Sequence, residues 1–88
     1  AEWQAWELRI TDRAAHDLDQ LDAATAGRAL AATARYATTG HGSVKQLTGI
    51  RPPLFSLRVG VYLVLFERDL SAHALVVTRI LHRREAYR

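Results

Sequence analysis

Residues 54–68 read LFSLRVGVYLVLFER, and this stretch decides the fold. Two apolar runs, one on each side of Gly60, predict two strands joined at a tight bend or bulge. In the second run, Val61, Leu63 and Leu65 face one side of the sheet and the residues between them face the other. Helices can cover only one side. We therefore expect Leu63 and Leu65 to form open apolar surface, unless a loop and the chain end shield them.

Two further stretches have strand character. Trp6, Leu8 and Ile10 alternate with polar residues, which is the period of a strand with one buried face. Residues 75–81 form a β-branched run that follows a predicted turn at 69–72. These stretches add one strand before and one strand after the central pair.

Helix-capping residues mark two helices between the first strand and the central pair. Thr11 precedes an apolar stripe and is followed by Asp12, a favourable charge in a first helical turn. Asp22 begins a second, alanine-rich helix that runs to about Thr39 and ends at Gly40. With almost no loop between them, the two helices should form an antiparallel hairpin.

The elements together predict a single α+β domain over residues 1–88. Residues 40–53, with three glycines and a Pro-Pro pair, are expected to be loop. The predicted order is βααβββ, an antiparallel-rich twisted sheet with the helical hairpin packed on one face. The chain after residue 81 is a basic tail.

Length and composition exclude several classes of protein. The 88 residues, 49% hydrophobic and 24% charged, are enough for one folded domain and are not typical of a disordered chain. The sequence has no cysteine, so disulfides and thiolate metal sites are excluded. No histidines stand at metal-ligand spacing, and no apolar run is long enough to span a bilayer. We expect a cytoplasmic protein without metal, cofactor or membrane association.

The positive charge is concentrated in the second half of the chain. The net charge is +3, but residues 1–44 carry −2 and residues 45–88 carry +5. Eleven of the 12 basic residues are arginine, whose planar fork suits phosphate and carboxylate. A nucleic acid or an acidic protein is therefore one expected partner, and an ordinary solvated surface is the alternative.

Several motifs in order resemble the RelE/ParE superfamily of toxins from type II toxin–antitoxin pairs. Residues 45–49 (KQLTG) are similar to its K-x-L-x-G loop, 58–62 (RVGVY) to its R-x-G-x-Y hairpin and 64–67 (VLFE) to the strand that follows. Residues 82–87 (HRREAY) resemble its H-R-x-x-x-Y ending, and 10–21 resemble its first helix. The match covers nearly the whole chain.

The resemblance implies a RelE-like fold and a toxin held by a cognate acidic antitoxin in a hetero-oligomer. RelE-like members cut messenger RNA on the ribosome without a metal, whereas ParE-like members inhibit DNA gyrase. In the nuclease reaction the ribose 2′-hydroxyl attacks the adjacent phosphate, which needs a proton acceptor and cations around the phosphorane. We expect the RelE-like activity, and keep a gyrase inhibitor, or a degraded toxin that only binds its antitoxin, as the alternative.

Carried over by motif position, four residues are the candidate catalytic set. Arg58 would bind the scissile phosphate, Arg83 would stabilise the transition state or help the leaving oxygen, and Tyr87 would stack on the nucleotide. His82 is the best candidate for proton transfer, because histidine titrates near neutral pH. Further expected RNA contacts are Lys45, Arg51 and Arg84. Leu63 and Leu65 are the expected antitoxin contacts.

Two positions depart from the family pattern. Ser56 and Leu63 stand where many nucleases of the family have basic residues, which removes phosphate-binding charge. These departures favour the non-enzymatic alternative, whereas the intact H-R-x-x-x-Y ending favours the nuclease. A small RNA-binding module is a third reading, which the scarcity of aromatic residues disfavours.

Overall fold

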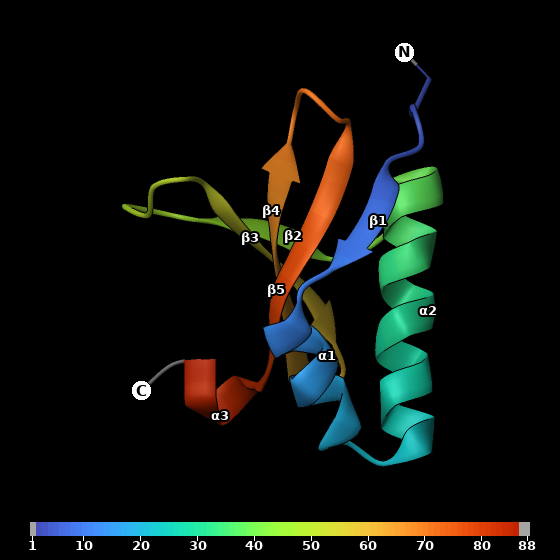
Figure 1. The fold of residues 1–88 in the computed structure, drawn as a ribbon, viewed down its shortest axis with the longest axis vertical. Coiled ribbons are helices and arrows are strands. Elements are labelled where there is room, and N and C mark those ends of the chain that lie inside the picture. The colour runs from blue at the N-terminus through green and yellow to red at the C-terminus, as the bar shows by residue number, and fades with distance from the viewer. Residues whose placement is uncertain (1, 87–88) are drawn as a thin grey trace.

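A computed structural model describes residues 2–86 as one sheet with helices packed against it (Figure 1). The elements in chain order are β1 (Glu7–Ile10), α1 (Asp12–Asp19), α2 (Ala23–Thr39), β2 (Val44–Leu47), β3 (Leu54–Val59), β4 (Tyr62–Asp69), β5 (Ala74–His82) and α3 (Arg83–Ala86). The sheet order is β1-β5-β4-β3-β2. Only β1 pairs in parallel, with β5, and the other neighbours are antiparallel. The predicted α+β class is confirmed.

The predicted helix boundaries coincide with the observed caps. The Thr11 side chain accepts a hydrogen bond from the Ala14 N–H at the start of α1, and Asp22 accepts one from the Thr25 N–H at the start of α2. Gly40 ends α2 in the left-handed conformation, with φ of +77°. These local signals are properties of single residues and their near neighbours, so the sequence pattern reveals them directly.

One strand was not predicted from the sequence. Residues 44–47 lie within the expected loop but form β2, the edge strand, which pairs with β3 through partners such as Lys45 and Ser56. The prediction of loop throughout 40–53 is therefore wrong. A four-residue strand containing Lys and Gln has little signal of its own, and its pairing with β3 defines it.

The hydrophobic core lies between the helices and one face of the sheet. Phe66, Leu57 and Leu75 are almost fully buried there, packed with Ala29 and Tyr36 of α2. In Figure 1, α2 stands beside β1, while α1 continues from the end of β1 along the lower part of β5. We call the face opposite this core the open face.

No helix within residues 2–86 is long and apolar enough to cross a membrane. In the same part of the chain, no three side chains among His, Cys, Asp and Glu gather closely enough to hold a metal ion.

Candidate functional site

Two cross-strand rows of side chains on the open face contain several of the predicted site residues. The first row contains Ser56 of β3, Leu65 of β4 and Arg79 of β5, and the second contains Arg58, Leu63 and Leu81 of the same strands. Lys45 of β2 extends the first row at its outer end. These two rows have apolar side chains in their middle and basic side chains near their ends, while Glu67 and Asp69 of β4 lie further along the same face.

The two leucines at the centre of the open face are buried. Leu63 is 6% exposed and Leu65 is 9% exposed, so the expectation that they form open apolar surface is wrong. The register places Arg58 beside Leu63 and Arg79 beside Leu65 on the neighbouring strands. Their burial within this chain does not test the predicted contact with an antitoxin, which stays a prediction.

Ser56, the first departure from the family pattern, is also buried, at 6% exposed. Leu63, the second departure, lies one strand away in the neighbouring row. A cation at either position would have to leave a covered site to reach solvent. Ser56 and Leu63 are therefore packed residues of the sheet and do not line a solvated groove.

Arg58 and Arg83 both lie at the end of the sheet where β3 turns into β4. Arg58 is exposed, and its Nε donates to the Gly60 carbonyl at 3.4 Å. The Arg83 backbone N–H donates to the Val61 carbonyl at 2.7 Å, which ties the start of α3 to the same turn. Gly60 makes the turn with φ of +59°, a left-handed conformation that favours glycine. Two of the four predicted catalytic residues are thus brought to one end of the sheet.

His82 does not join Arg58 on the open face. It pairs with Tyr62, whose side chain packs against the core, and the two rings meet edge to face with centroids 5.4 Å apart. Its Nδ1 accepts a hydrogen bond from the Arg84 N–H, and Glu85 Oε1 lies 3.4 Å from the His82 N–H. This reciprocal pattern resembles a capping box, so His82 caps the start of α3 and its Nε2 is the ring nitrogen left for proton transfer.

The other predicted residues lie in different places. Lys45 is exposed on β2, at the outer end of the first row. Arg51 is exposed in the loop before β3, at the opposite end of that strand from Arg58, so the structure does not bring it to the predicted site. Arg84 is exposed on α3. Tyr87 lies outside the described residues.

A groove of about 570 Å³ runs beside β5 between the end of α1 and α3. Its wall includes Asp17 and Arg79 on one side and His82, Arg84 and Glu85 on the other. The groove therefore contains both acidic and basic groups. Its volume is in the range that holds a small ligand or one nucleotide.

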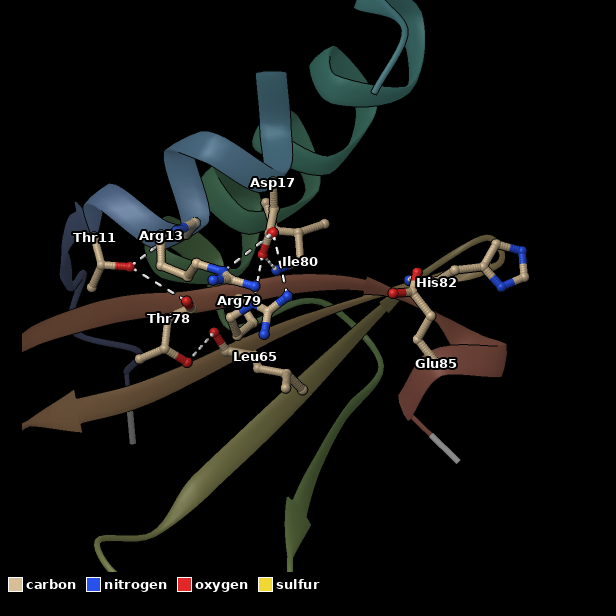
Figure 2. A network of polar contacts seen from close by, with 10 residues as sticks. Thr11, Arg13, Asp17, Leu65, Thr78, Arg79, Ile80, His82 and Glu85 are labelled. Carbon is tan, nitrogen blue, oxygen red and sulfur yellow. Dashed lines mark hydrogen bonds and ion pairs between the residues drawn. The ribbon is translucent and has the colours of Figure 1, made fainter. Parts of the chain in front are cut away.

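Asp17 and Arg79 form the best-connected polar contact at this groove (Figure 2). Arg79 Nε donates to Asp17 Oδ2 at 2.9 Å, and the Ile80 N–H donates to the same oxygen at 2.9 Å. Burial raises the pKa of Asp17, but the hydrogen bonds from Arg79 and Ile80 and the charges of Arg79 and Arg13 outweigh it, so the net pKa is lowered. The Asp17 hydrogen bond in turn raises the pKa of Arg79.

Sequence reasoning missed Asp17 and Arg79 as site residues. The available signal was the polar pair Thr78-Arg79, which interrupts the apolar run of residues 75–81. Strict alternation from Val77 would point Arg79 into the core. A β-bulge at Thr78 instead places Arg79 on the opposite face. The hydrophobic pattern of the sequence does not predict this bulge.

Comparison with known proteins supports the same fold. No family model and no curated protein matches the chain. Among solved structures, it resembles a chain of the archaeal RelE–RelB complex of Pyrococcus horikoshii, with a TM-score of 0.73 and 18% identity over 91% of this chain and 97% of that one. A chain of the RelB–RelE antitoxin–toxin complex of Methanococcus jannaschii gives a TM-score of 0.72 at 18% identity, covering 90% and 94%.

A third similar structure is the toxin–antitoxin complex RelBE2 of Mycobacterium tuberculosis. Its chain has 27% identity and a TM-score of 0.69, with 94% of this chain and 98% of that chain covered. The fold of the protein is therefore the RelE-like toxin fold, as its motifs had implied.

Proposed function

We propose that the protein is the toxin of a type II toxin–antitoxin pair and acts as a metal-independent endoribonuclease on ribosome-bound messenger RNA. The observation that carries the proposal is the RelE-like fold, combined with Arg58 and Arg83 at one end of the sheet. The three similar structures described above are named as complexes of a RelE-type toxin with its antitoxin.

The proposed reaction breaks one phosphodiester bond by transfer to the neighbouring 2′-oxygen. The 2′-hydroxyl loses its proton and its oxygen bonds to phosphorus, while the bond to the 5′-oxygen breaks and that oxygen takes up a proton. Arg58 holds the phosphate through its guanidinium fork, and Arg83 stabilises the charge on the phosphorane. His82 Nε2 serves in proton transfer, and Tyr87 orients the base by stacking.

We propose an acidic antitoxin as the protein partner, in a cytoplasmic hetero-oligomer. Residues 45–88 carry a net charge of +5, and the two rows of the open face include Lys45, Arg58 and Arg79, which suit carboxylates. An antitoxin segment lying over Arg58 would block the phosphate site by charge pairing alone. Contact with Leu63 and Leu65 stays a prediction, and it requires the side chains that cover these two leucines to move aside.

A second candidate function is a toxin that binds its target without cutting RNA, such as a gyrase inhibitor. The observation in its favour is that Ser56 and Leu63 are buried at positions where many nucleases of the family have basic residues. His82 also acts as a helix cap on the core side of the sheet, which restricts its use as a base.

The two candidates are separated by cleavage in a purified system. The protein is added to ribosomes programmed with a defined message, and Arg58→Ala and Arg83→Ala are compared with the wild type. Loss of a cation at a transferring phosphoryl group typically costs about 100-fold in rate or more. Arg35→Ala, an exposed arginine on α2, is the matched control and should cut normally. No cleavage by the wild type, or wild-type cleavage by both site variants, contradicts the nuclease assignment.

A further inference from the structure

The β-bulge in β5 turns one arginine out of the core and onto the open face. Leu65 pairs with Arg79 and Phe66 pairs with Val77, so Thr78 is the extra residue. Without the bulge, Arg79 would follow Val77 into the core. Bulges often redirect a side chain next to a functional site, and the one here places a cation across from Leu65.

The bulge is fixed from both sides. The Thr11 hydroxyl, at the start of α1, lies 3.4 Å from the Thr78 carbonyl oxygen, and the Thr78 hydroxyl donates to the Leu65 carbonyl at 3.3 Å. Figure 2 shows both contacts beside the Arg79 side chain. The position of Arg79 is therefore held by its neighbours in α1 and β4.

Asp17 fixes the orientation of the Arg79 guanidinium. It accepts from Nε at 2.9 Å and from Nη2 at 3.4 Å, which occupies one edge of the fork. The Nη1 side is left for another acceptor, and the Arg79 side chain is 34% exposed. The Asp17 side chain is only 11% exposed, so the Arg79 guanidinium is the more accessible member of the pair.

Arg79 is the third basic residue, after Lys45 and Arg58, in the two rows that contain Leu63 and Leu65. In the first row it lies three strands from Lys45, which corresponds to about 14 Å between Cα atoms at normal strand spacing. Arg58 lies two strands away in the neighbouring row, at about 12 Å. Because Asp17 holds the Arg79 guanidinium at the edge of β5, the two arginines suit different phosphates of one RNA strand.

We propose that Arg79 is an RNA-backbone contact of the open face, with Asp17 as its positioning residue, and that it takes the place of the cations missing at Ser56 and Leu63. The inference rests on the proposed function, because it assigns a phosphate of the RNA to Arg79. Asp17 already holds one edge of the Arg79 guanidinium in place. Phosphate binding at the other edge therefore costs less side-chain conformational entropy.

The test is the salt dependence of binding to a short 2′-O-methyl oligoribonucleotide, which cannot be cut by 2′-hydroxyl attack. Asp17→Asn, which keeps an acceptor for Arg79 and Ile80, is compared with Asp17→Asn/Arg79→Gln, in which two neutral amides face each other. Arg13→Gln is the matched control, because Arg13 lies 3.9 Å from Asp17 and is 64% exposed. Circular dichroism and thermal melting confirm that each variant is folded.

For single strands, the slope of log affinity against log salt falls by about 0.7 for each phosphate that the protein no longer neutralises. We expect the double variant to have a slope lower by about 0.7 than that of Asp17→Asn, and Arg13→Gln to keep the wild-type slope. Equal slopes in that pair, with a lower slope in Arg58→Gln, overturn the role of Arg79 while leaving the proposed function standing. If the wild type shows no salt-dependent binding and Arg58→Gln changes nothing, RNA binding itself fails.

Discussion

Replacing Asp17 by alanine is the sharpest test of how this fold is held together. Asp17 accepts hydrogen bonds from the Arg79 side chain and from the Ile80 N–H, and its side chain is 11% exposed. Hydrogen bonds to a charged group are worth about 1.5–3 kcal/mol each, reduced here because Arg79 is partly solvated. We expect Asp17→Ala to lower the free energy of unfolding by about 3 kcal/mol.

That decrease is large for a chain of this size. A domain of this length typically has about 4–13 kcal/mol of stability, and about 3 kcal/mol lowers its Tm by roughly 12–24 °C. The assay is urea unfolding followed by tryptophan fluorescence, with thermal melting as a second measurement. Asp19→Ala, an exposed aspartate on the same helix, is the control and should change stability by less than about 0.5 kcal/mol. If Asp17→Ala costs no more than the control, Asp17 does not hold α1 to β5.

The same ion pair has a pH signature. The pKa of Asp17 is lowered in the folded protein, so its stabilising contribution is fully present above the unfolded value near 3.8 and is lost as pH falls through the folded value. The stability difference between the wild type and Asp17→Ala should therefore shrink as pH drops below about 4. Unfolding curves collected from neutral pH downward measure this difference. A gap that stays constant to low pH would contradict the assignment of the charge to Asp17.

Three further variants test the packing. Gly40→Ala should cost about 1–2 kcal/mol, because φ is +77° and a new Cβ would lie 2.6 Å from the Trp3 ring. Gly27→Ala, where nothing lies within 4 Å, should instead stabilise by up to about 1 kcal/mol. Ser56→Lys with Leu63→Arg should lower stability by about 2–4 kcal/mol, because both residues are only 6% exposed. Urea unfolding measures all three, and a reversed sign for either glycine, or a cost below about 0.5 kcal/mol for the double variant, refutes the corresponding packing assignment.

The helices and the central strands could be predicted because their signals are local. The capping residues Thr11 and Asp22 bond to N–H groups three residues ahead, and the strands around Gly60 show their period within a few residues. The strand at residues 44–47 could not be predicted, since its four residues gain strand geometry only by pairing with β3. Local chemistry therefore predicts most elements, and tertiary pairing defines the rest.

The candidate site was predicted only in part, for reasons that lie in the sheet. Motif position identified Arg58 and Arg83, which the structure does bring to one end of the sheet. It did not reveal that His82 caps α3 from the core side. The bulge at Thr78 changes which residues of β5 face the core, so simple alternation along the strand gives the wrong face. The same bulge concealed Arg79. The burial of Leu63 also escaped prediction, since it depends on side chains from neighbouring strands.

The central claim is that this RelE-like fold acts on messenger RNA, and mapping RNA 5′ ends after induced expression in bacteria tests it most directly. The account predicts growth arrest with new 5′ ends inside translated codons, and the disappearance of those ends in Arg58→Ala expressed at the same level. Growth arrest with double-strand DNA breaks and no new message ends would contradict the nuclease and favour a toxin that acts on gyrase.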